Sequence, residues 1–179
     1  MTLVARIAQL RVALGFVFGA LVLWLARPTV GSIEIGMSIA ACGEALRVWA
    51  AGHLNKAREV TASGPYRWCA HPLYVGSSIM GVGLAIACAS VVVGALIAVY
   101  LSVTLTAAIR NEEAFLRGEF GDRYERYRRQ GVVNDGRRFS VAQAIANREP
   151  RAIAGFALAV LLLILKATYN GSFGRAAGP

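Results

Sequence analysis

The residues best suited to chemistry form a short run from Gly64 to Gly76, GPYRWCAHPLYVG, and a later triplet, Asn111, Glu112 and Glu113. Within the run, His71-Pro72 predicts the start of a helix, because proline is tolerated in a first helical turn. The free amides and the positive dipole end of that helix are suited to holding a carboxylate or another anion. The run and the triplet therefore place ionisable side chains where they can bind charged groups.

The elements that carry these residues belong to a membrane protein. Hydrophobic residues make up 56% of the 179 residues and charged residues only 16%, which is outside the usual range for soluble domains. A helix needs about 20 apolar residues to cross a bilayer, and windows of about that length begin at Val12, Val30, Leu73, Ser90 and Ile153. The sequence predicts an all-α integral membrane protein with five transmembrane helices, in one domain over residues 1–179.

The third and fourth of these helices form a hairpin that turns near Ala89-Ser90. Such a hairpin returns Glu112 and Glu113 to the same side of the membrane as His71. We therefore expect the two chemistry-bearing stretches to meet in space.

The distribution of basic residues predicts the orientation, since Lys and Arg are retained on the cytoplasmic side. The N-terminus is predicted to be inside and the C-terminus outside, with the first helix retained rather than cleaved as a signal. Arg27, Lys166 and Arg175 alone fall outside. Anionic lipid headgroups account for the net charge of +9, so no nucleic acid partner is needed. The inside set comprises Arg6, Arg11, Lys56, Arg58, Arg67 and ten arginines from Arg110 to Arg151.

The second helix carries Glu44 and Arg47, three residues apart and therefore on one helical face. Charges within a membrane segment are costly unless they are paired or face a polar cavity, and they suggest a functional site. The pair also lies within two turns of the inner end, where both side chains can reach water. A role in positioning an acceptor and a purely solvated pair both remain open.

A polar cytosolic segment over residues 110–151 separates the fourth and fifth helices. Leu116, Phe120, Tyr124 and Tyr127 recur at helical spacing, but Gly118 and Gly121 predict a kinked or interrupted amphipathic helix. A second short helix is expected over residues 139–147 at the membrane surface. The three cysteines, Cys42, Cys69 and Cys88, have no disulfide or metal spacing, and Cys69 is interpreted as a packing residue.

In this order and spacing, GPYRWCAHPLYVG, the triplet NEE, and FGDRYERY from Phe120 to Tyr127 resemble the isoprenylcysteine carboxyl methyltransferase and phospholipid methyltransferase group of integral membrane enzymes. The resemblance extends from about Gly43 to Tyr127 and includes ALRVWAAGHL. The family pattern has arginine where this chain has Ala70. Arg67 or Arg110 would have to substitute for it, or cofactor affinity is lower.

The resemblance implies S-adenosylmethionine as the cofactor, bound in a cytosol-facing pocket, and a lipophilic acceptor that enters from the bilayer. Glutamate can accept hydrogen bonds from the cofactor's ammonium, and His71 with helix-end amides can donate to its carboxylate. Tyrosine rings can pack on the adenosine, and Gly76 would allow close approach. The implied cofactor residues are Tyr66, Arg67, His71, Pro72, Tyr74, Gly76, Glu112 and Glu113.

The sequence leaves the acceptor open. A carboxylate or thiolate acceptor needs no base, whereas an ammonium must first lose a proton. The plausible proton acceptors are Glu44, His71, Glu112 and Glu113. A nicotinamide-dependent reductase of the sterol reductase type and a non-enzymatic membrane scaffold are the alternatives. No metal site is predicted.

Overall fold

The described residues of this chain, in a computed structural model, are 15–56, 58–130 and 136–172, and they contain helices and no strand. After a helix at Gly15–Leu25, the elements are α2 (Val30–His53), the 3-10 helix η1 (Gly64–Arg67), α3 (Pro72–Ala87), α4 (Val91–Phe120), α5 (Asp122–Gln130), α6 (Val141–Ala146) and α7 (Glu149–Tyr169). The all-helical prediction is confirmed for this part of the chain.

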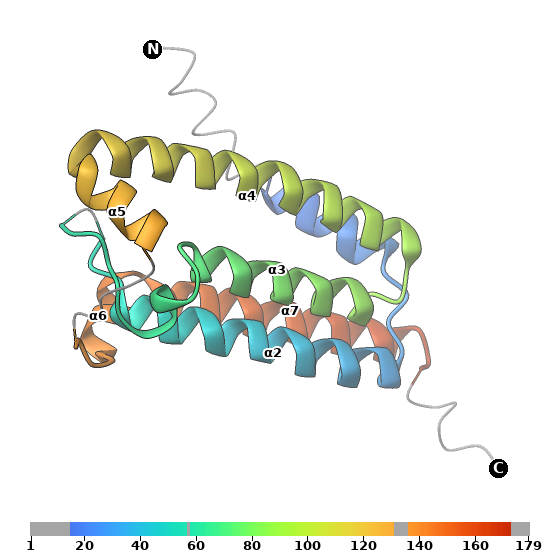
Figure 1. Cartoon of the computed structure of the whole chain (residues 1–179). Coiled ribbons are helices and arrows are strands. Elements are labelled where there is room, and N and C mark those ends of the chain that lie inside the picture. The colour runs from blue at the N-terminus through green and yellow to red at the C-terminus, as the bar shows by residue number, and fades with distance from the viewer. Residues whose placement is uncertain (1–14, 57, 131–135, 173–179) are drawn as a thin grey trace, which may run out of the picture.

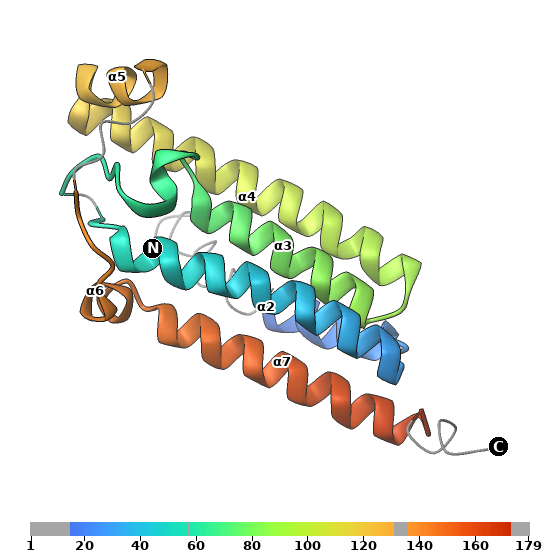
Figure 2. The ribbon, with the colours of Figure 1, turned by 60° about the horizontal axis from the view of Figure 1, so that its bottom comes forward.

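The long helices α2, α3, α4 and α7 run side by side with alternating directions (Figures 1 and 2). The segments η1, α5 and α6 gather at one end of this bundle, where α2 and α4 end and α3 and α7 begin. We call it the polar end, because the segments between these helices carry most of the arginines of the chain. The polar cytosolic segment predicted from the sequence corresponds to the end of α4, α5, α6 and the start of α7.

Within the described ranges, two helices, α4 with 30 residues and α7 with 21, are long and apolar enough to cross a membrane. Gly15–Leu25 and α3 are apolar but shorter, and α2 carries charged residues. Helices occur at all five predicted positions, although the predicted start at Val12 lies outside the described residues. Five membrane crossings remain a prediction.

Helices α2 and α3 make the closest packing in the bundle, because small residues remove the side chains between their backbones. A Cβ atom added to Gly36 would lie 2.4 Å from the carbonyl oxygen of Gly83. One added to Gly43 would lie 2.6 Å from the carbonyl oxygen of Gly76. This contact fixes the position of the N-terminal end of α3, which carries His71.

The predicted interruption of the amphipathic helix is confirmed at Gly121, whereas Gly118 lies within the continuous helix α4. Helix α4 ends at Gly121, whose φ of 44° belongs to the left-handed region that glycine adopts without strain. The chain then folds back as α5 (Figure 1). The short surface helix expected over residues 139–147 is present as α6, and Val141 and Ile145 are exposed on it.

The sequence placed Lys166 among the basic residues outside the membrane, and the structure gives it a further role in joining two helices. Its ammonium donates to the main-chain carbonyl oxygens of Leu23 and Trp24, the latter at 2.6 Å. These carbonyls belong to the last turn of Gly15–Leu25 and have no partner within that helix. Lys166 therefore ties α7 to the first helix at the end opposite the polar end.

Candidate functional site

His71 and the two glutamates meet at the polar end, as the predicted hairpin requires. His71 is the N-cap residue of α3, and Glu112 and Glu113 lie in the last third of α4. The Nε2 atom of His71 is 3.3 Å from Oε1 of Glu113, and its Nδ1 atom is 3.8 Å from Oε2 of Glu112. Residues 42 positions apart thus form one cluster, in which the imidazole stands between two carboxylates.

Two arginines balance Glu113 from the outer side. Arg117, one turn further along α4, lies 3.2 Å from Oε2 of Glu113, and Arg128 of α5 lies 3.5 Å from the same oxygen. Arg117 also pairs with Glu125 at 3.2 Å. Glu113 is therefore held by cations on one side and by His71 on the other, which fixes its position.

Beside this cluster lies a pocket of about 460 Å³, which we call the polar pocket. Tyr74 hydrogen-bonds Glu112 within it. Its walls combine tyrosine rings, the carboxylates of Glu59 and Glu112 and aliphatic side chains, so it offers both stacking surfaces and groups that accept hydrogen bonds. The lining residues are Leu54, Lys56, Glu59, Val60, Thr61, Tyr66, Ala70, Leu73, Tyr74, Asn111, Glu112, Phe115, Leu116, Tyr124 and Tyr127.

Helix α5 closes one side of the polar pocket. The Tyr127 hydroxyl donates to the main-chain carbonyl of Tyr66 at 2.9 Å, and Tyr124 is buried. Burial raises the pKa of Tyr127 to about 12, with smaller contributions from Cys69 and Tyr124. Burial, and next the charge of Glu112, also raise the pKa of Tyr66. These phenols therefore stay neutral and can act as hydrogen-bond donors around the pocket.

Five predicted cofactor residues do not line the polar pocket: His71 and Glu113 belong to the cluster beside it, and the others are Arg67, Pro72 and Gly76. Arg67 is exposed, with its guanidinium carbon 5.1 Å from the centre of the Trp68 ring, and Pro72 is buried at the first turn of α3. Gly76 faces α2, where an added Cβ would lie 2.7 Å from Cγ of Arg47. Its small size therefore serves helix packing, and a cofactor contact at Gly76 stays a prediction.

The arginines that contact Glu113 differ from those that the sequence suggested. Arg67 or Arg110 was expected to replace the arginine absent at Ala70. The structure instead places Arg117 and Arg128 against Glu113, because the turn at Gly121 folds α5 back onto α4. Ala70 itself lines the polar pocket, so a longer side chain at this position would extend into it.

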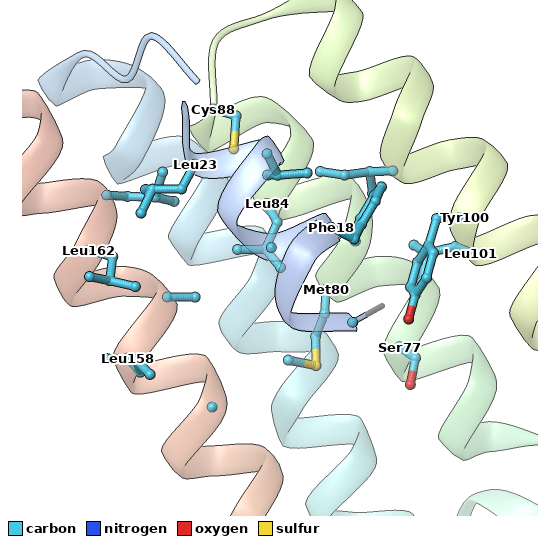
Figure 3. Close-up of a pocket in the computed structure, with 18 of the residues that line it drawn as sticks. Phe18, Leu23, Ser77, Met80, Leu84, Cys88, Tyr100, Leu101, Leu158 and Leu162 are labelled. Carbon is cyan, nitrogen blue, oxygen red and sulfur yellow. The ribbon is translucent and has the colours of Figure 1, made fainter. Parts of the chain in front are cut away.

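A second, larger pocket of about 760 Å³ lies inside the bundle, between Gly15–Leu25, α3, α4 and α7 (Figure 3). We call it the apolar pocket, since almost all of its lining is aliphatic or aromatic, including Phe18, Leu84 and Leu158. Arg47 and Ser77 contribute a guanidinium and a hydroxyl. Ser77 stands one helical turn beyond Leu73, which lines the polar pocket, so the two pockets are neighbours along α3.

Arg47 is the centre of a buried polar network. The predicted pair with Glu44 is confirmed at 3.4 Å, but Arg47 lies closer to Glu149 of α7, at 2.9 Å, and also donates to Ser77. Glu149 is buried in the first turn of α7 and was missed by the sequence analysis. An acidic residue before a proline at a helix start, in Glu149-Pro150, is the signal that could have identified it.

Glu44 and Arg47, the two residues predicted to position an acceptor, face different spaces. Arg47 lines the apolar pocket, whereas Glu44 lines a groove between α2 and α7. A direct contact of Glu44 with a molecule in the apolar pocket is therefore not supported by its position. Among the described residues, no group of three or more His, Cys, Asp or Glu is placed to hold a metal ion.

The family described as Phospholipid methyltransferase matches residues 10–123, a range that contains His71, the glutamate pair and Arg47. A cobalt-zinc-cadmium resistance protein, CzcN, of Cupriavidus metallidurans is 31% identical over 134 residues, which are 69% of this chain and 61% of that protein. No solved structure matches.

A nickel-cobalt-cadmium resistance protein, NccN, of Alcaligenes xylosoxydans xylosoxydans is 30% identical over 99 residues, or 54% of this chain and 45% of that protein. This chain therefore spans about half to three fifths of the length of these curated relatives.

Proposed function

The chain belongs to the phospholipid methyltransferase family, and from this premise we propose that it transfers a methyl group from S-adenosylmethionine to a lipophilic acceptor in the membrane. The observation that carries the proposal is the pair of neighbouring pockets. The polar pocket, with its tyrosines and carboxylates, lies at the polar end of the bundle, and the apolar pocket lies among the long helices. A water-soluble donor and a lipid acceptor need two such compartments close together.

The residues of the polar pocket fit this cofactor. The hydroxyl of Tyr124, which lines this pocket, and Nδ1 of His71, in the cluster beside it, are buried and have no hydrogen-bond partner among the described residues, so both are suited to bonding a ligand. Glu112 would accept hydrogen bonds from the cofactor's ammonium, while Tyr66 and Tyr74 would pack on its adenosine. His71 and the amides at the start of α3 would face its carboxylate. When bound, S-adenosylmethionine supplies a methyl group on a positively charged sulfur.

The protein's contribution to such a transfer is alignment and exclusion of water, since a displacement at a sulfonium needs no covalent enzyme intermediate. Arg47 and Ser77 would hold the head of the acceptor beside the turn of α3 that separates the pockets. If the acceptor is an ammonium, its proton must leave first, and His71, Glu112 or Glu113, which form one cluster, would accept it.

For the whole chain we propose five membrane crossings, with the polar end and the N-terminus in the cytosol and the C-terminus outside. The apolar lengths of α4 and α7 and the family support a membrane protein. The arginines of the polar end would lie against anionic headgroups. A cysteine introduced at Arg126 should be labelled only from inside, and one at Tyr169 only from outside.

The decisive experiment is a labelled-methyl assay. The purified chain, in nanodiscs made from a total lipid extract, is incubated with methyl-labelled S-adenosylmethionine, and the labelled lipid is identified by mass spectrometry. Transfer of label to a lipid supports the function and names the acceptor.

Two results would contradict the proposal. Binding of a nicotinamide dinucleotide in place of S-adenosylmethionine would favour a reductase. Binding of neither cofactor by folded protein would favour a membrane scaffold.

A further inference from the structure

The groove lined by Glu44 is separate from both pockets described above. It has a volume of about 510 Å³ and lies between the last turns of α2 and the first turns of α7, with Phe139 at its edge. None of its residues lines the polar or the apolar pocket. Because α2 ends and α7 begins at the polar end, the groove lies at the level expected for lipid headgroups.

Aromatic side chains form much of its wall, and their positions are fixed by contacts outside the groove. The Trp49 ring meets the ring of Trp68 edge-on at 5.5 Å. Phe139 lies against Gly52, where an added Cβ would come within 2.2 Å of its ring, and the amide of Ser140 donates to the carbonyl of Gly52 at 3.1 Å. Phe156 of α7 completes the aromatic surface. Faces of this kind attract cations through the ring quadrupole.

Of the residues that the structure describes, Glu44 is the single ionisable one that lines the groove, and its charge is incompletely balanced. It is only 7% exposed, and neither of its carboxylate oxygens has a hydrogen-bond partner in the described residues. Arg47 lies nearer to Glu149 than to Glu44, so one guanidinium serves two buried carboxylates. A buried carboxylate without a donor is costly, and a cation supplied from outside would complete the cluster.

We propose that this groove binds a lipid with an ammonium headgroup, as a site separate from the methyl-transfer site. The ammonium lies among Trp49, Phe139 and Phe156 and completes the charge balance of Glu44, while an acyl chain follows the α2–α7 groove past Ile153. The lipid is bound and not altered. The proposal does not depend on the proposed function, since a lipid that cannot accept a methyl group can occupy the site.

Phosphatidylcholine is the appropriate probe, because its quaternary nitrogen is already fully methylated. Phosphatidylglycerol with the same acyl chains serves as the matched lipid without an ammonium. Native mass spectrometry of the detergent-purified chain, titrated with each lipid, measures retention. We expect the wild type to prefer phosphatidylcholine by about tenfold, and Glu44→Gln to lose that preference, as for removal of an interaction with a charged group.

Trp49→Leu should weaken phosphatidylcholine retention about threefold through loss of a cation–π contact. Glu34→Gln, on the exposed part of the same helix, is the control and should retain the preference. Equal retention of both lipids by the wild type, or an undiminished preference in Glu44→Gln, would overturn the assignment. If Glu44→Gln does not fold, Trp49→Leu and Phe156→Leu decide the question in the same way.

Discussion

At the scale of single residues, the His71 cluster is the part of the site with the most specific geometry. His71 comes just before α3 and Glu113 lies near the end of α4, and these two helices form a hairpin that brings their side chains to within 3.3 Å. Replacing either one by alanine should weaken S-adenosylmethionine binding by about 1.5 to 3 kcal/mol, the range for hydrogen bonds to charged groups. Calorimetry on purified variants measures this loss. Glu119→Ala, an exposed carboxylate on the same helix, should leave binding unchanged.

Ala70 and Arg117 test how the chain manages without the arginine of the family pattern. Arg117→Ala removes a guanidinium from Glu113 and should weaken cofactor binding, because the carboxylate loses a contact that orients it. Ala70→Arg places a guanidinium in the polar pocket and should partly restore binding in that background. A double-mutant cycle measures the coupling. Strict additivity of the two changes would show that the positions act independently.

Tyr127 makes the stability of the folded protein depend on pH in the alkaline range. Its pKa is raised from about 10 to about 12 mainly by burial, so folding favours the neutral phenol. The stabilisation is complete below about pH 10 and is lost as the pH rises through about 12. Ultraviolet titration of the phenols should therefore show one fewer late-titrating group in Tyr127→Phe. Thermal unfolding of that variant should be less sensitive to pH between those values than unfolding of the wild type.

At the scale of elements, the α2–α3 contact depends on glycine. The Cβ of Gly36→Ala would meet the backbone of α3, which no side-chain rotation can relieve, so this substitution should destabilise the protein by about 1–3 kcal/mol. Gly31→Ala, on the same helix with nothing within 4 Å of its added Cβ, should be neutral or stabilising. Thermal unfolding in detergent compares the two. Equal stability of both variants would contradict this view of the contact.

The elements themselves could largely be predicted, and their partners could not. Apolar runs, the proline after His71 and the glycine at position 121 predicted the helices, the start of α3 and the break after α4, since these signals are local. The contacts of Arg47 with Glu149 and of Lys166 with Leu23 depend on how α7 packs. Glu149-Pro150 marks the start of a helix, but no local pattern shows that this carboxylate reaches Arg47, so the sequence showed the Glu44–Arg47 pair without its third member.

At the scale of the whole molecule, the arrangement of the two pockets predicts the route of the acceptor. Arg47 and Ser77 lie at the part of the apolar pocket next to the polar pocket, and most of the remaining wall is aliphatic or aromatic. A lipid tail can therefore fill the apolar pocket while its head lies near the cofactor. Because binding of the remote tail helps to position the reacting atom, short water-soluble analogues should react poorly.

Gly155→Phe provides the sharpest test of this route. Gly155 lines the apolar pocket and has nothing within 4 Å of an added Cβ, so a phenyl ring should enter the pocket without displacing a helix. We expect the KM for the lipid acceptor to rise about tenfold or more while cofactor affinity is unchanged, because only the tail loses its space. Ala157→Phe, on the same helix and lining none of the three spaces, is the control.

Arg47→Ala should depress turnover more than cofactor binding, because Arg47 lines the apolar pocket and not the polar pocket. Efficient methylation of short analogues, or an unaltered KM in Gly155→Phe, would exclude the apolar pocket as the acceptor site.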